Sequence, residues 1–184
     1  MLKMLAKQTQ HHVLFCGFAD KGRGSEIVRV GVISDTHGSF STAMQAINKM
    51  GTIDALIHAG DLYSDALQIS SDIKVPVYAV TGNCDITDPG QEELIFTLGD
   101  YKIYITHGHL YRVKNTLQLL YYRVQEVEAQ VAVFGHTHVP VNTWQNNVLL
   151  FNPGSTSRPP PGVKASFGIL DIGTDGAKGE IFSL

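Results

Sequence analysis

Five apolar, β-rich segments of the sequence each end close to Asp, Asn or His residues, and this repeated order is the strongest constraint on the fold. The segments are Val28–Ile33, Ala55–Ile57, Val75–Thr81, Lys102–Thr106 and Val131–Phe134. Residues at the carboxyl ends of neighbouring strands in an α/β sheet converge on a single crevice. The pattern therefore predicts a sheet protein whose polar strand ends meet in one place.

The side chains that follow these segments are of the kinds that bind metal ions. They are Asp35, His37, Asp61, Asn83, His107, His136 and His138. Together they would bring two carboxylates, one amide oxygen and four imidazoles into one pocket, which is too many ligands for one ion and about right for two. A mixed oxygen and nitrogen set favours Mn, Fe, Zn, Ni or Co over ions that prefer thiolates.

Strands and helices are expected to alternate in the first half of the chain. The spacing of apolar residues predicts a helix from about residue 41 to residue 50, which Gly51 ends. A shorter helix is expected within residues 64–70, before the third strand. Alternation of this kind predicts parallel strands that are covered by helices.

The second half is expected to contain hairpins and one longer helix. Gly99-Asp100 is a hairpin turn signal between strands at 94–98 and 101–106. A helix is predicted from about residue 114 to residue 128, with an apolar stripe on its inner side. Further strands are predicted at 131–134, 139–144, 148–151, 166–170 and near 179–182. The expected fold is two β-sheets packed face to face, with helices outside them.

Composition is that of an ordinary globular protein. The chain has 184 residues, which suits a single domain, and it is 43% hydrophobic and 17% charged. Its formal net charge is −3 and it has no run of Lys or Arg, so no strong nucleic-acid patch and no membrane-binding surface is expected. No segment approaches the length of a transmembrane helix.

The N-terminal residues and the cysteines bear on domain organisation and location. Residues 1–27 contain a short apolar patch without a signal-peptide cleavage pattern, and they are expected to form a disordered extension. Residues 28–184 are then expected to form the single working domain. Cys16 and Cys84 lie far apart in the sequence, which disfavours a disulfide framework and makes the cytoplasm the expected location.

The ordered motifs resemble those of one enzyme family. They are Asp35-Thr36-His37, Gly60-Asp61, Gly82-Asn83-Cys84-Asp85, His107-Gly108-His109 and Gly135-His136-Thr137-His138. This series resembles the calcineurin-like metallophosphoesterases, and most of all their small bacterial and archaeal phosphodiesterase branch, over roughly residues 29–171. The resemblance implies an α/β fold, namely a four-layer αββα sandwich of two mixed β-sheets flanked by helices.

The resemblance also implies how the metal ligands divide between two divalent ions. Asp35, His37 and His138 would hold the first ion, and Asn83, His107 and His136 the second, with Asp61 bridging them. Manganese is the ion that the resemblance suggests, while Ni, Zn, Fe and Co remain compatible. A hydroxide that bridges two such ions, about 3.5–4 Å apart, would attack the phosphorus atom.

Cys84 departs from the wider family, in which many members carry His at the matching position to protonate the leaving alcohol. A thiol is a weaker hydrogen-bond donor, with an ordinary pKa of about 8.5. One interpretation is that Cys84 contacts the leaving group or substrate, so that esters with acidic leaving groups react best. The alternative is that it packs as a small apolar residue.

Other polar residues near these motifs have two possible roles each. His58 is either a residue that orients a metal ligand or a core histidine, and His109 either lines the mouth of the site or is a loop residue. Asp85 could hold the backbone or a ligand imidazole. Arg158 could clamp a phosphate oxygen or remain a solvated loop residue, and Ser155 could contact phosphate.

The main functional hypothesis is a dinuclear, metal-dependent phosphodiesterase that acts on a small phosphodiester substrate. The alternative is a non-catalytic, protein-binding scaffold on the same fold, because one eukaryotic trafficking subunit similar to this family works mainly through partners. A third possibility is that the ions are purely structural. The physiological substrate, the native metal and the oligomeric state are left open by the sequence.

Overall fold

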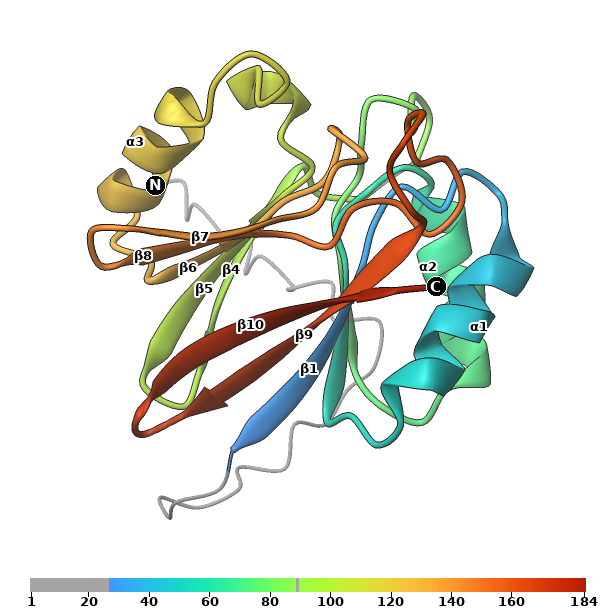
Figure 1. Cartoon of the computed structure of the whole chain (residues 1–184), viewed down its shortest axis with the longest axis horizontal. Coiled ribbons are helices and arrows are strands. Elements are labelled where there is room, and N and C mark those ends of the chain that lie inside the picture. Colours follow the sequence, from blue (N-terminus) through green and yellow to red (C-terminus); the bar gives the residue numbers. More distant parts are fainter. Residues whose placement is uncertain (1–26, 89) are drawn as a thin grey trace, which may run out of the picture.

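The computed structural model describes residues 27–88 and 90–184, which form two β-sheets between layers of helices (Figure 1). In chain order the elements are β1 (Val28–Ile33), α1 (Phe40–Met50), β2 (Ala55–His58), α2 (Tyr63–Asp72), β3 (Val77–Ala79), β4 (Glu93–Leu98), β5 (Tyr101–Thr106), η1 (His109–Tyr111), α3 (Gln118–Glu126), β6 (Val131–Val133), β7 (Val141–Gln145), β8 (Val148–Asn152), β9 (Ser166–Gly173) and β10 (Gly176–Ser183).

Both sheets have five strands and mixed directions. The order is β10-β9-β1-β2-β3 in the first sheet and β4-β5-β6-β8-β7 in the second. In the first sheet β1, β2 and β3 are parallel, and β9 pairs antiparallel with both β1 and β10. In the second sheet β5, β6 and β8 are parallel, while the outer strands β4 and β7 pair antiparallel with their neighbours. The parallel strands of each sheet therefore carry the polar loops that follow them to the same end of that sheet.

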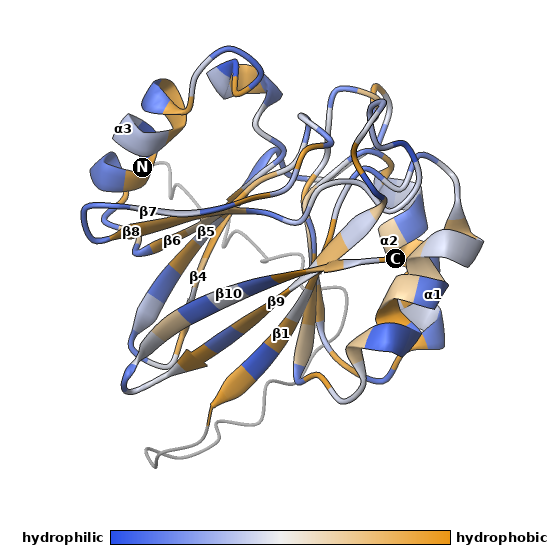
Figure 2. Ribbon diagram, in the orientation of Figure 1, coloured by the Kyte–Doolittle hydropathy of each residue, from blue (hydrophilic) through white to orange (hydrophobic). Residues whose placement is uncertain are grey.

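Alternating side chains of each strand face different layers. Val32 of β1 packs between the sheets, while the next residue, Ile33, packs under α1 and α2. In β5, Ile103 likewise faces the other sheet, and Tyr104 packs under α3. Because successive side chains of a strand point to opposite faces, both sheets are apolar on both sides. In Figure 2 hydrophobic and hydrophilic residues alternate along strands such as β1 and β10.

The arrangement confirms the predicted four-layer αββα sandwich of two mixed sheets. Within the described residues, α1 and α2 cover the first sheet, and α3 covers the second on the opposite side of the molecule (Figure 1). No helix in residues 27–88 and 90–184 is long and apolar enough to cross a membrane. The predicted N-terminal extension lies, except for Ile27, outside the described residues and stays a prediction.

Two elements are shorter than the sequence predicts. α3 spans Gln118–Glu126 where residues 114–128 were expected to be helical. Residues before it form hydrogen-bonded turns instead, and the Thr116 hydroxyl accepts the Gln118 N–H, 3.2 Å away. β3 is confined to Val77–Ala79 within the expected 75–81. Pro76 has no N–H for a ladder, so it contributes only its carbonyl, which accepts the Leu56 N–H.

Candidate metal centre

Strand ends from both sheets supply the side chains of the site. Asp35 and His37 follow β1 and Asp61 follows β2 in the first sheet, while His107 follows β5 and His138 follows β6 in the second. The backbone there is unusual, because Asp35, His37, Asp61, His136 and His138 all have φ between 46° and 66°. Non-glycine residues adopt this left-handed conformation uncommonly, and they keep it only when the surroundings enforce it. Tight loops thus hold the site residues.

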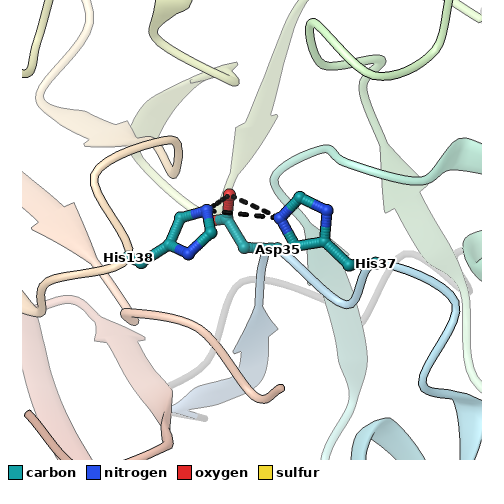
Figure 3. Close-up of side chains that lie close together, drawn as sticks. All are labelled: Asp35, His37 and His138. Carbon is teal, nitrogen blue, oxygen red and sulfur yellow. Dashed lines mark hydrogen bonds and ion pairs between the residues drawn. The ribbon is translucent and has the colours of Figure 1, made fainter. Parts of the chain in front are cut away.

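Asp35, His37 and His138 form the first group that could hold a metal ion. One ligand atom of each lies within 4.8 Å of the others. Oδ1 of Asp35 is 3.1 Å from Nε2 of His138 and 4.0 Å from Nε2 of His37, and the two Nε2 atoms are 3.2 Å apart. Figure 3 shows the Asp35 oxygen between the two rings, which come from different sheets. These are the three residues predicted for one ion.

Asp35, Asp61 and His107 form a second, fully buried group. Nε2 of His107 lies 3.3 Å from Oδ2 of Asp61 and 3.9 Å from Oδ1 of Asp35. The two carboxylates therefore face the same imidazole from neighbouring loops. Asp61 also belongs to a third group, with His37 and Cys84. Both carboxylates lie between imidazoles of the two sheets.

The buried atoms of the second group fit a cation. Among the described residues, Oδ1 of Asp35 and Nε2 of His107 are buried and make no hydrogen bond. Such orphaned polar atoms are rare in folded proteins and call for a ligand. A divalent ion would give both atoms a partner, and carboxylate with imidazole is a donor set that Mn, Fe, Zn, Ni and Co accept.

Hydrogen bonds on the far side of two rings set their tautomers. Nδ1 of His107 donates to the Ala59 carbonyl, 2.8 Å away, and Nδ1 of His138 donates to the Arg158 carbonyl, 2.6 Å away. A proton on Nδ1 leaves the Nε2 lone pair free, and in both residues Nε2 points at the carboxylates. This backing by carbonyl groups is what metal-binding histidines ordinarily have.

The charges of the site are mutually dependent. Burial would raise the pKa of Asp61, but the His107 imidazole and the Cys84 N–H hold it well below its usual range. Burial lowers the pKa of His107, yet Asp61 and Asp35 outweigh this and raise it. Contact with Asp35 raises the pKa of His138. Asp61 is thus ionised, and its negative charge attracts positive charge to the centre of the site.

His136 and Asn83 lie at the margin of this cluster. The His136 ring packs edge-on against His107 with a centroid distance of 5.1 Å. The backbone N–H of His136 donates to Oδ2 of Asp35 over 3.1 Å. Burial, His107 and Lys114 lower the pKa of His136 to about 4, so the ring is neutral. Asn83 is exposed, and its amide nitrogen lies 3.6 Å from Sγ of Cys84. Within the described residues, His136 is in none of the three groups.

Cys84 contacts Asp61 directly. Its N–H donates to Oδ1 of Asp61 over 3.0 Å, and its thiol donates to Oδ2 over 3.3 Å. Partial burial and the Asp61 carboxylate raise the pKa of the thiol to about 11, so Cys84 is protonated at neutral pH. The side chain is nevertheless exposed. This contact was not anticipated from the sequence, and the predicted leaving-group role of Cys84 stays a prediction.

The remaining candidates lie around the site. The His109 ring is 5.6 Å from the His107 ring and 6.1 Å from the His136 ring. Arg158 is exposed, and its charge lowers the pKa of His37, although burial contributes most. The Ser155 hydroxyl is buried and donates to the Asp35 carbonyl over 2.8 Å. It therefore supports the loop, and the predicted contact of Ser155 or its backbone amide with phosphate stays a prediction.

The sequence did not indicate that three further residues, Lys114, Thr36 and Asp65, interact with the residues of the site. Lys114 is exposed, and its charge contributes to lowering the pKa of His136. Thr36 and Asp65 are buried behind the metal-binding loops and hydrogen-bond to each other. The only available sequence signal was the position of Thr36 between Asp35 and His37. The burial of the Asp65 carboxylate in α2 is visible only in the structure.

Known proteins are similar to this chain in sequence and in fold. Residues 28–175 match the calcineurin-like phosphoesterase superfamily domain. The probable metallophosphoesterase YsnB of Bacillus subtilis is 37% identical over 148 residues, which is 79% of this chain and 85% of that protein. The phosphodiesterase YfcE of Escherichia coli is 39% identical over 106 residues, and the match covers 52% of each chain.

Solved structures show the same architecture. A conserved uncharacterized protein of Streptococcus pneumoniae, described as a predicted phosphoesterase, is 29% identical with a TM-score of 0.74, over 87% of this chain and 91% of that one. Vps29 of Entamoeba histolytica, solved with Zn²⁺, is 21% identical with a TM-score of 0.66, over 84% of this chain and 98% of that one. At that identity, the likeness to Vps29 concerns the fold alone.

Proposed function

The chain belongs to the calcineurin-like phosphoesterase superfamily, and we propose that it is a phosphodiesterase that hydrolyses small phosphodiesters at a centre of two divalent ions. The observation that carries the proposal is the buried cluster of Asp35, Asp61 and His107, in which two polar atoms make no hydrogen bond within the described residues. Relatives named metallophosphoesterase and phosphodiesterase support the same reaction class.

Seven residues would hold the ions. Asp35, His37 and His138 are proposed for one ion, and Asn83, His107 and His136 for the other, with Asp61 between them. When bound, two divalent ions lower the pKa of a water molecule and polarise the phosphoryl oxygens. Manganese is proposed as the ion, with Ni, Zn, Fe and Co as alternatives. Asn83 and His136 would need to turn inward from their marginal positions.

The residues of the chain set the charge of the site. Two divalent ions carry four positive charges, and the carboxylates of Asp35 and Asp61 remove two of them. Asn and His ligands are neutral and leave the remaining positive charge in place, and this charge attracts a phosphodiester anion. Arg158 and Lys114 are exposed and add positive charge near His37 and His136. We propose that Arg158 contacts a phosphate oxygen.

Hydrolysis of bis-p-nitrophenyl phosphate tests the function. The purified protein should hydrolyse this diester when Mn²⁺ is added, and a chelator should abolish the activity. Asp61→Ala should lower the rate at least 100-fold, because it removes the carboxylate between the ions, whereas Asp171→Ala, far from the site, should not. A folded, metal-loaded protein that hydrolyses no phosphoester would overturn the proposal.

Cys84 gives a finer prediction about the substrate. Its protonated thiol is held by Asp61 and is a weak acid, so little protonation of the leaving alcohol is expected. Rates should therefore rise steeply as the leaving group becomes more acidic across a series of aryl and alkyl diesters. Cys84→His should flatten this dependence. A flat dependence in the unaltered protein would contradict the assignment.

A protein-binding scaffold is the second candidate, and the shared fold with Vps29 favours it. The presence of all seven proposed ligands argues for turnover instead. The diester assay separates the two candidates, because a scaffold would bind metal and stay folded without hydrolysing any phosphoester.

A further inference from the structure

A chain of buried polar side chains lies behind the candidate metal centre. It consists of His58, Thr36 and Asp65, which are 0%, 0% and 7% exposed. None of them belongs to the groups of described residues that could hold a metal ion. Polar groups are costly to bury, and they occur in protein interiors where they hydrogen-bond to a purpose-built partner.

The hydrogen bonds of this chain run in one direction. Nδ1 of His58 accepts the Gly60 N–H over 3.3 Å, so the ring proton is on Nε2. Nε2 lies 3.1 Å from the Thr36 hydroxyl oxygen and donates to it. The Thr36 hydroxyl in turn donates to Oδ2 of Asp65 over 2.5 Å. Each donor of the chain thus has an acceptor.

Both ends of the chain are tied to the loops that carry the proposed ligands. Thr36 stands between Asp35 and His37, and Gly60 directly precedes Asp61. Oδ2 of Asp65 also accepts the N–H of Gly38 over 2.9 Å, directly after His37. The hydrogen-bonded chain therefore joins the loop after β1, the loop after β2 and helix α2.

These loops need such support. Asp35, His37 and Asp61 all have positive φ, a conformation that side chains other than glycine adopt only when their surroundings enforce it. Backbone bonds contribute, since the His37 N–H donates to the Asp61 carbonyl over 3.2 Å. The Thr36 hydroxyl lies 3.3 Å from that same carbonyl, so it sits at the junction of the two loops.

We propose that Thr36, His58 and Asp65 are positioning residues, whose hydrogen-bonded chain fixes Asp35, His37 and Asp61 in the geometry that binds the metal ions. The inference rests on the proposed function in that it concerns the same site. Residues that orient metal ligands from behind typically change metal affinity by about 10–100-fold when altered. If these three side chains only filled the core, an apolar side chain of equal size at position 36 would leave the metal affinity unchanged.

The isosteric pair Thr36→Val and Thr36→Ser separates these two roles. Thr36→Val keeps the volume and removes the hydroxyl, whereas Thr36→Ser keeps the hydroxyl. Calorimetric titration of the metal-free proteins with Mn²⁺ should show an affinity at least 10-fold weaker for Thr36→Val, and Thr36→Ser should restore most of the loss. Thr42→Val is the matched control. The Thr42 hydroxyl donates to the backbone carbonyl of Ser39 and takes no part in the hydrogen bonds among His58, Thr36 and Asp65.

The ring protonation of His58 provides a measurement that needs no variant. In metal-free protein labelled with ¹⁵N, His58 should show the tautomer with the proton on Nε2, and Thr36→Val should shift that nitrogen signal. A proton on Nδ1 of His58 would overturn the proposal, as would a folded Thr36→Val variant with unchanged Mn²⁺ affinity.

The outcomes separate this inference from the proposed function. If the unaltered protein binds Mn²⁺ but hydrolyses no phosphoester, the proposed function is wrong. A weaker Mn²⁺ affinity of Thr36→Val would in that case still support the positioning role. If the unaltered protein hydrolyses phosphoesters and Thr36→Val keeps full Mn²⁺ affinity, only the positioning role is wrong.

Discussion

At Gly82 the backbone passes against the Asp61 carboxylate without room for a side chain. A Cβ atom there would overlap Oδ1 of Asp61 and lie 2.8 Å from its backbone nitrogen. Gly135 is placed similarly: a Cβ atom there would overlap Oγ of Ser34 and lie 2.8 Å from Oδ2 of Asp35. At both sites the glycine is required by the close approach of the backbone to a carboxylate of the metal centre.

Gly82→Ala is accordingly expected to displace Asp61. The added methyl group should weaken Mn²⁺ binding at least 10-fold and lower stability by about 1–3 kcal/mol, the usual cost of overpacking. Calorimetric titration and denaturant unfolding would measure the two effects. Gly173→Ala, at the end of β9, serves as the control, because its Cβ would meet only the flexible Ile27 side chain, 3.3 Å away. Equal Mn²⁺ affinity in the two variants would refute the expectation.

His58 makes stability depend on pH. Burial lowers its pKa from 6.5 to about 4, so the unfolded state binds more protons between these values. The contribution of neutral His58 to the free energy of unfolding is therefore fully present above about pH 6.5 and is lost as the pH falls toward 4. The difference corresponds to roughly 3 kcal/mol. In metal-free protein, His58→Gln should flatten the decline of the melting temperature over this range. His136 also has a lowered pKa and should maintain part of the slope in both proteins.

At the scale of helices and strands, local pattern predicted most of the fold. Apolar runs and turn residues located the strands, because each strand of this sandwich is buried and bounded by loops. The predicted boundary of α3 was wrong: the apolar stripe continues before Gln118, but the residues there form hydrogen-bonded turns. The Thr116 hydroxyl accepts the Gln118 N–H, and α3 starts at Gln118. Parallel strands also explain why the site residues converge, since all of them follow strand ends.

Details of the site depend on contacts between distant parts of the chain. The proton on Nδ1 of His138 is fixed by the carbonyl of Arg158, and the Asp35 carbonyl accepts the hydroxyl of Ser157, 122 residues away. The Cys84 contact with Asp61 spans 23 residues. No local pattern encodes such partners, so tautomers, positive φ values and buried carboxylates could not be derived from the sequence alone.

Asp85 links the loop after β3 to the start of α2. Oδ1 accepts the N–H of Tyr63, the first residue of that helix, and Oδ2 accepts the N–H of Gly82, each over 2.7 Å. Asp85→Ala would leave both buried donors unpaired, at a cost of about 2–4 kcal/mol. Urea unfolding should show this loss. Asp171→Ala breaks a more exposed ion pair with Arg29 and should cost less than about 1 kcal/mol. Losses of equal size would contradict the linking role.

At the scale of the whole molecule, the candidate centre lies where the two sheets meet. Asp35, His37 and Asp61 follow strands of the first sheet, and His107 and His138 follow strands of the second. A bound ion would therefore join the sheets at that edge. The sheets are already held by an apolar cluster between them that includes Val32, Ile57 and Phe151, so the fold does not depend on the ion alone.

Metal binding should consequently stabilise the protein without being needed for folding. At a Mn²⁺ concentration of 100 times the dissociation constant, binding adds about 2.7 kcal/mol to the free energy of unfolding. For a chain of this size, that corresponds to a rise in melting temperature of roughly 5–11 °C. Asp61→Ala should abolish the rise, and scanning calorimetry with and without Mn²⁺ would measure both.

Chelation gives the decisive contrast. The metal-free protein should keep its far-UV and near-UV circular dichroism while losing phosphodiesterase activity, because the three large apolar clusters contain no proposed ligand. If removing the ion instead unfolds the domain, the ions are structural, and the orphaned atoms of Asp35 and His107 would then reflect a folding requirement. Recovery of activity on adding Mn²⁺ back, with no change in circular dichroism, would establish that the centre is catalytic.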